Sequence, residues 1–258
     1  MSGLAGRRAL VTGGGRGIGR AVALDLARAG AAVAVASRTA QERDAVRAEV
    51  AALGVASVAL PCDVSRVEDV REMFRQARAA LGGVDILVNG AGIAPSAPLV
   101  KTSDELWHAA LETNLSGAFY CLREALPEMA QRGWGRAVNL ASIAGKTGNP
   151  YIAAYSASKH GLLGLTKVAA LEMAEHGVTV NAVCPGYVDT PMTDAGVARM
   201  AEKTGRPAAE IRRRIEDMSP QKRLVTSEEV SALVLFLCGD AARGITGQAL
   251  SVDGGTVV

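Results

Sequence analysis

The sequence predicts one α/β domain, residues 1–258, in which helices cover both faces of a doubly wound, seven-stranded parallel sheet. Short apolar segments alternate with longer amphipathic ones, a pattern that gives parallel strands joined by helical crossovers. The short segments lack polar alternation, which is typical of strands buried on both faces. No internal repeat or Pro/Gly-rich linker divides the 258 residues, a length that one such domain can reach.

Seven segments have the composition of buried strands, and they lie at 9–11, 31–36, 57–60, 85–88, 136–140, 179–183 and 249–252. The connections between them look helical. In the third connection, apolar residues recur at steps of three and four, as on one helix face: Val67, Val70, Phe74, Ala77 and Leu81. The second connection repeats this pattern with Val46, Val50 and Leu53.

One connection differs from the others. Residues 193–218 are polar and charged, have a helical pattern, and follow the sixth strand. They are expected at the carboxyl edge of the sheet, where open α/β sheets bind ligands. We interpret them as a mobile substrate lid, and the alternative is a peripheral helical ornament.

Composition argues against several classes of protein. The formal net charge of +2 gives no concentrated basic surface for nucleic acid. No apolar run reaches the ~20 residues that span a bilayer, and residues 1–8 do not resemble a secretory signal. The scattered cysteines and histidines indicate reduced thiols in a cytoplasmic protein and no metal site.

A glycine-rich turn follows the first strand directly and opens a helix. Gly13, Gly17 and Gly19 would allow a tight turn, close approach of a pyrophosphate, and close packing of helix on strand. The free N–H groups of the helix N-terminus would bind the phosphates. The turn therefore predicts a dinucleotide site that includes Gly13, Gly15, Arg16, Gly17, Ile18 and Gly19.

The end of the second strand indicates which dinucleotide is bound. NAD sites place an acid there to accept from the ribose 2′-hydroxyl, whereas this strand ends in Ser37 and Arg38. Ser37 can donate to a 2′-phosphate, and Arg38 can pair with its charge, as can Arg16 from the glycine turn. We therefore expect NADP(H) rather than NAD(H), although both arginines could instead be solvated surface residues.

The glycine spacing is G-x-x-x-G-x-G, and further motifs accompany it along the chain. They are Asn89-Gly90-Ala91-Gly92, Asn114, Ser142, the pair Tyr155 and Lys159, and Pro-Gly-Tyr-Val-Asp-Thr at 185–190. In order and spacing the whole chain resembles the short-chain dehydrogenase/reductase family. It departs from that family at Gly90, where a second asparagine is usual, and we expect looser hydrogen bonding there.

The resemblance assigns further cofactor contacts. It implies that Asp63 accepts from the adenine amino group, and that Thr190 and the backbone at Val188 bind the nicotinamide carboxamide. It also implies that Lys159 holds the nicotinamide ribose. The remaining contacts that it implies are Val64, Asn89, Gly90, Ala91, Tyr155, Pro185 and Gly186.

Ketone reduction needs a proton on oxygen, and Tyr155 is the candidate donor. A phenol with a pKa of about 10 is a weak acid, but an ammonium group lowers that value, and Lys159 at i+4 shares the helix face. The resemblance implies that Ser142 donates to the substrate carbonyl and that Asn114, at a helix irregularity, holds a water of the proton relay. Ser116 and Gly117, which are weak helix formers, fit such an irregularity.

The segment 155–192 looks most like β-ketoacyl and polyketide ketoreductases, with Tyr151 and Tyr187 lining the substrate site. The resemblance therefore implies NADP(H)-dependent reduction of a 3-oxoacyl thioester or polyketide-type ketone. Two alternatives stay open: a dehydrogenase of a small secondary alcohol or 3-hydroxy acid such as hydroxybutyrate, and a non-catalytic NADP-binding regulator. The family also implies a homotetramer that buries the helix at 154–176 and the helix before it.

Overall fold

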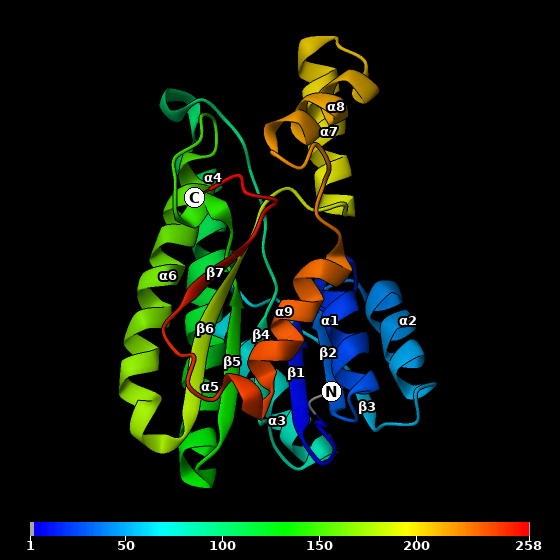
Figure 1. The fold of residues 1–258 in the computed structure, drawn as a ribbon, viewed down its shortest axis with the longest axis vertical. Helices are drawn as coiled ribbons and strands as arrows, with labels where there is room; N and C mark the ends of the chain where they lie inside the picture. Colours follow the sequence, from blue (N-terminus) through cyan, green and yellow to red (C-terminus); the bar gives the residue numbers. More distant parts are fainter. Residues whose placement is uncertain (1–2, 258) are drawn as a thin grey trace.

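The computed structural model describes residues 3–257 and contains a seven-stranded parallel sheet in the order β3-β2-β1-β4-β5-β6-β7 (Figure 1). The strands are β1 Arg8–Thr12, β2 Ala32–Ser37, β3 Ser57–Pro61, β4 Ile86–Asn89, β5 Gly135–Leu140, β6 Val178–Pro185 and β7 Ala249–Val252. Each predicted strand is confirmed, with ends that differ by at most two residues.

Helices cover both faces of the sheet, as predicted. Helices α1 (Gly17–Arg28), α2 (Ala40–Ala51) and α9 (Ser227–Cys238) contribute to one apolar core with alternate strand residues such as Val33 and Val35. Helices α3 (Val67–Leu81), α5 (Gly117–Arg132) and α6 (Ala153–Met173) contribute to the other core with the intervening strand residues. Because every strand packs on both faces, its side chains need no polar alternation.

The order of the strands places a crevice beside the glycine turn. Strand β1 pairs with β2 on one side and with β4 on the other, so the chain reverses its direction of winding at β1. The connections that leave the carboxyl ends of β1 and β4 therefore diverge to opposite faces. Such a switch point is where doubly wound sheets bind their ligands.

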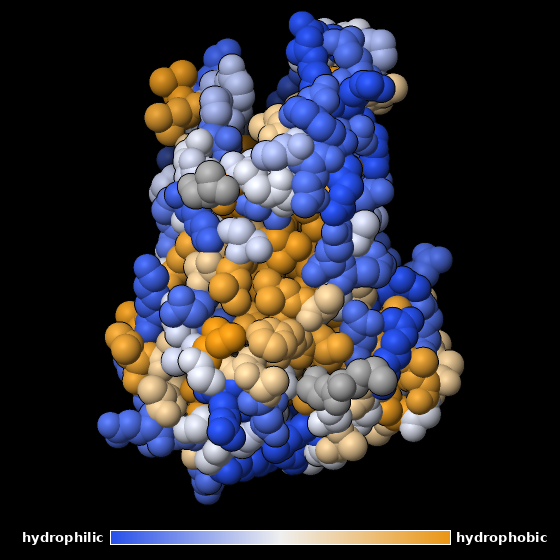
Figure 2. Space-filling model, viewed as in Figure 1, coloured by the Kyte–Doolittle hydropathy of each residue, from blue (hydrophilic) through white to orange (hydrophobic). Residues whose placement is uncertain are grey.

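The polar insertion is helical and lies where it was predicted. It forms α7 (Pro191–Thr204) and α8 (Ala208–Met218), which project beyond the carboxyl edge of the sheet (Figure 1). Most of their visible surface is hydrophilic (Figure 2). Beneath it, Val197, Ile211 and Ile215 pack with Leu224, which follows α8, in a small apolar core. Arg212 of α8 adds ion pairs to Asp189 and Asp194, at 2.7 and 2.9 Å. The two helices thus form one packed unit, and its mobility stays a prediction.

Between α4 (Asp104–Leu111) and α5 the helix widens into a π-helical turn, Glu112–Ser116. This turn confirms the predicted irregularity, and it contains Asn114. Across residues 3–257, no helix combines the length and the apolar character that a membrane span requires.

Candidate active site

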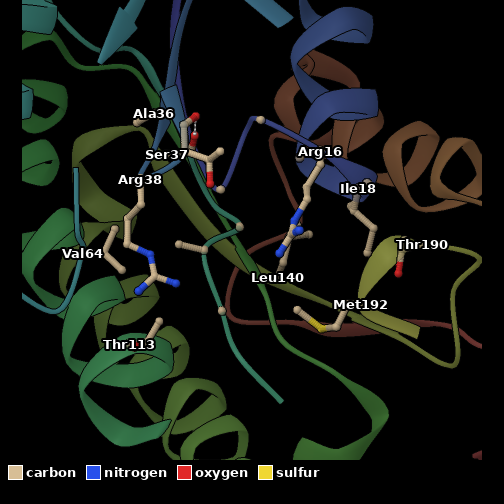
Figure 3. Close-up of a pocket in the computed structure, with 18 of the residues that line it drawn as sticks. Arg16, Ile18, Ala36, Ser37, Arg38, Val64, Thr113, Leu140, Thr190 and Met192 are labelled. Atoms are coloured by element: carbon tan, nitrogen blue, oxygen red, sulfur yellow. Dashed lines mark hydrogen bonds between the residues drawn. The ribbon is translucent and has the colours of Figure 1, made fainter. Parts of the chain in front are cut away.

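A cleft opens at the carboxyl edge of the sheet, along the crevice beside β1 and β4 (Figure 3). The β1–α1 turn forms its floor, and the ends of the other strands and the start of α7 complete its wall. Most of the predicted cofactor residues line it: Gly13, Gly15, Arg16, Gly17, Ile18, Gly19, Ser37, Arg38, Asp63, Val64, Gly90, Ala91, Tyr155, Lys159, Pro185 and Thr190.

The glycine turn is shaped so that side chains are excluded from it. A Cβ atom on Gly19 would lie 2.2 Å from the carbonyl oxygen of Gly13. One on Gly13, whose φ is +66°, would lie 2.7 Å from the amide nitrogen of Ala91. Helix α1 begins at Gly17 with its first N–H groups at the cleft. The turn therefore fits the pyrophosphate of a dinucleotide, which needs close backbone approach and unpaired N–H donors.

Three predicted cofactor residues are not among those that line the cleft. The side chain of Asn89 is buried in the sheet and donates to the amide oxygen of Asn139 at 2.9 Å. The N–H of Gly186 donates to Val252 at 3.0 Å. The carbonyl of Val188 already accepts the Thr193 hydroxyl at 2.6 Å, which leaves the N–H of Val188 as its group for a ligand.

The backbone of Gly90 is well bonded even without the asparagine side chain. Its N–H lies 3.1 Å from both the carbonyl and the hydroxyl oxygen of Thr12, so the loop is tied firmly to β1. A Cβ atom on Gly90 would lie 2.7 Å from that Thr12 carbonyl. The missing side chain therefore lets the two segments approach more closely than an asparagine would allow.

The candidate catalytic residues Ser142, Tyr155 and Lys159 come together at the far end of the cleft. Ser142 follows β5, and the other two lie in the first two turns of α6. The Lys159 ammonium is 5.7 Å from the centre of the Tyr155 ring and donates to the carbonyl of Leu140 at 2.7 Å. Lys159 is 5% exposed, and burial lowers its pKa to about 8.

Tyr155 differs from expectation in one respect. Burial raises its pKa and outweighs the opposing effect of the Ser142 hydroxyl. The protein's own groups thus shift the pKa of Tyr155 upward, whereas the sequence suggested that Lys159 would lower it. Desolvation is the larger effect, although Tyr155 as a whole is only half-buried.

Asn114 connects the loop after β4 to helix α6. Its amide exchanges two hydrogen bonds with the backbone of Ile93, at 2.8 and 2.9 Å, and donates to the Ser158 hydroxyl at 2.9 Å. Ser158 in turn donates to the carbonyl of Tyr155 at 2.7 Å. Asn114 therefore fixes the start of α6, while its role in a water relay stays a prediction.

Comparison with known proteins agrees with this geometry. A family model described as "Enoyl-(Acyl carrier protein) reductase" matches residues 13–257. The D-beta-hydroxybutyrate dehydrogenase of Cupriavidus necator is 41% identical over 98% of this chain and 99% of its own. The chain belongs to the short-chain dehydrogenase/reductase family.

Other relatives in the family have reductase names. The 3-oxoacyl-(acyl-carrier-protein) reductase of Staphylococcus epidermidis is 39% identical over 96% of this chain and 98% of its own. Among solved structures, a variant of actinorhodin polyketide ketoreductase with NADPH has a TM-score of 0.93 and 39% identity, and the match covers 97% of each chain.

In this short-chain dehydrogenase/reductase, one of the two tyrosines predicted to line the substrate site lies near Tyr155, and the other is exposed. Tyr187 lies close enough to Tyr155 that its phenol adds to the upward shift of the Tyr155 pKa. Tyr151 is 64% exposed and outside the cofactor cleft, with a φ of +70°. Its carbonyl accepts from the N–H of Ala97 at 2.8 Å, and that bond holds the loop before α6 against the loop after β4.

Several residues of this cleft were not predicted from the sequence. Glu42 lies in the first turn of α2, where an acid is common, and Thr113 is a polar residue of the π-helical turn. Neither residue stands out in the sequence. Met192 follows the Thr190 motif, and its position at the start of α7 could have suggested it. Gly92 ends the motif at 89–92. A Cβ atom there would lie 3.2 Å from the Asn114 side chain and 3.8 Å from the Lys159 ammonium.

Proposed function

We propose that the protein reduces the ketone of a 3-oxoacyl thioester or a similar polyketide-type substrate with NADPH. The observation that carries this proposal is the convergence of Ser142, Tyr155 and Lys159 beside a cleft that fits a dinucleotide. The names of the reductase relatives support the substrate class. A non-catalytic regulator would not need a buried lysine beside a half-buried tyrosine.

The residues of the chain have distinct tasks in this reaction. When bound, the reduced nicotinamide supplies a hydride to the carbonyl carbon. Ser142 donates to the carbonyl oxygen and stabilises the charge that develops there, and Tyr155 delivers the proton. Lys159 binds the nicotinamide ribose and favours the phenolate that Tyr155 leaves behind. Thr190 and the N–H of Val188 would bind the carboxamide and so orient the nicotinamide toward the substrate.

The preference for NADPH rests on the adenosine end of the cleft. Arg16 and Arg38 direct their guanidinium groups into it, and Ser37 stands where an NAD enzyme has an acid (Figure 3). Asp63 would accept from the adenine amino group. We expect kcat/KM to be at least about tenfold higher with NADPH than with NADH, because forked guanidinium–phosphate pairs are strong. Equal or better use of NADH would overturn the preference.

A second candidate activity is favoured by the hydroxybutyrate dehydrogenase of Cupriavidus necator, which matches along nearly its full length. Acetoacetyl-CoA, acetoacetate, and small aryl and cyclic ketones separate the possibilities when each is assayed by NADPH absorbance. The proposal predicts the highest kcat/KM for the thioester, whereas the second candidate predicts acetoacetate. Crotonyl-CoA, which offers a C=C bond in place of the ketone, should remain unreduced.

We also propose a cytoplasmic homotetramer. Apolar side chains are exposed on α5 and α6, where Phe119 is 41%, Val168 54% and Leu171 80% accessible. A second apolar area lies over β7 and α9, where Phe236 is 45% accessible (Figure 2). Two self-complementary faces are what a tetramer with dihedral symmetry uses. Sedimentation equilibrium should give about four times the chain mass of 26.5 kDa, and a monomer would refute the assembly.

A further inference from the structure

An acidic residue lies among the groups that face the adenosine end of the cleft. Glu42, in the first turn of α2, is one of the residues that line it. A Cβ atom on Gly15 would lie 3.1 Å from the Cβ of Glu42, so the glycine turn and this side chain are in close contact. The carboxylate accepts from Arg16 at 3.4 Å. Glu42 thus binds one of the two arginines that are expected to hold a 2′-phosphate.

The second arginine is paired in a similar way. Arg38 lies 3.6 Å from the carboxylate of Asp63. Burial tends to raise the pKa of Asp63, but hydrogen bonds from Ser65 and the charge of Arg38 lower it overall, so Asp63 is an anion at neutral pH. Each arginine at this end therefore faces one carboxylate, and the four side chains together have no formal net charge.

Among residues 3–257, the nearest further cation on α2, Arg43, is already engaged. Arg43, the neighbour of Glu42, is 8% exposed, donates to the carbonyl of Ser37 at 3.1 Å, and pairs with Asp44 at 3.3 Å. It is thus directed at the backbone of β2 and at its own acid. A bound 2′-phosphate has to share Arg16 with Glu42, and like charges that share one partner repel each other.

We infer that Glu42 is a specificity-determining residue that opposes the 2′-phosphate and so reduces the discrimination between NADPH and NADH. This inference deepens the proposed function, since it concerns the same cofactor site. Removal of the charge should strengthen binding of ligands that contain a 2′-phosphate and leave other adenosine ligands nearly unchanged. The partly exposed site keeps the effect moderate because solvent and salt screen it.

The test variant is Glu42→Gln, which keeps the shape of the side chain. Glu49→Gln is a matched control because Glu49 also lies on α2 and pairs with Arg20 of α1, but outside the cofactor cleft. Each variant loses one negative charge of α2 and the ion pair that this charge makes, with Arg16 of the glycine turn or with Arg20 of α1. Calorimetric titration at low salt would measure Kd for 2′,5′-ADP, 5′-AMP, NADPH and NADH. Steady-state kinetics would then give the ratio of kcat/KM with NADPH to kcat/KM with NADH.

We expect Glu42→Gln to bind 2′,5′-ADP and NADPH about 3- to 10-fold more tightly than the unaltered protein, with less than about twofold change for 5′-AMP and NADH. The gain should shrink as salt is added, and Glu49→Gln should show none. An unchanged NADPH/NADH ratio in Glu42→Gln would overturn the inference, as would an equal gain in Glu49→Gln. The unaltered protein's own ratio tests the proposed cofactor preference, whereas the change on substitution tests Glu42, so the two can fail separately.

Discussion

Replacement of Tyr155 by Phe should lower kcat for ketone reduction about 1,000-fold while Kd for NADPH changes less than about threefold. The variant keeps the ring that packs beside Lys159, at 5.7 Å from its ammonium, but loses the hydroxyl that donates the proton. Positioned proton donors contribute about 100- to 10,000-fold to rate. Cofactor binding depends mainly on the glycine turn and the adenosine end, which the substitution does not touch. Single-turnover kinetics with NADPH fluorescence measure both quantities.

Tyr151→Phe is the matched control, because this tyrosine lies four residues before Tyr155, in the loop that precedes α6, and its side chain is 64% exposed. It should keep kcat within about threefold, since its structural contact is made by the backbone carbonyl. If Tyr155→Phe retained more than about a tenth of kcat, another group would have to be the proton donor.

The substitution Lys159→Met should lower kcat/KM for NADPH about 100-fold and remove one limb of its pH profile. Burial places the pKa of Lys159 at about 8, so the ammonium is charged below that pH and loses its proton above it. The unaltered enzyme should therefore show a kcat/KM that falls as pH rises through about 8, because this ratio reports groups of the free enzyme. The raised pKa of Tyr155 places its own deprotonation higher.

Methionine fills a similar volume without a charge, and the profile of Lys159→Met should therefore be flat across this pH range. Lys167→Met, at an exposed position two turns further along α6, should keep the profile of the unaltered enzyme. A decline near pH 8 that persists in Lys159→Met would assign the titration to another group.

The periodicity of apolar residues in the sequence was sufficient to predict the architecture. The strands are short and apolar, and the turns and amphipathic helices between them are local features, so all seven were predicted with ends correct to two residues. The position of the insertion that forms α7 and α8 followed from its polarity. Its start at Pro191, two residues earlier than predicted, reflects the Thr190 N-cap, whose hydroxyl accepts from the N–H of Thr193.

The site was predictable where its residues occur in local motifs, as with the glycine turn and the spacing of Tyr155 and Lys159. Residues whose role depends on packing between distant segments were not. Glu42 is ordinary in a first helical turn, and only the contact between α2 and the Gly15 backbone brings it to the cleft. The effect of Gly90 likewise depended on the position of the Thr12 carbonyl.

The direction of the Tyr155 pKa could not be read from spacing either. The i+4 relation to Lys159 indicates proximity, but burial decides the balance, and burial follows from the complete fold. The positive φ of Tyr151 also has no signal in the sequence, because tyrosine does not favour that conformation.

We propose that this chain catalyses hydride addition to a ketone with Tyr155 as the proton donor. The most direct measurement is mass spectrometry of the product formed from acetoacetyl-CoA and NADPH that contains deuterium at both C4 positions. The unaltered enzyme should give a 3-hydroxybutyryl product with one deuterium on C3, and Tyr155→Phe should give almost none in the same time. Tight NADPH binding without labelled product from this thioester, acetoacetate or the small ketones would contradict this proposal.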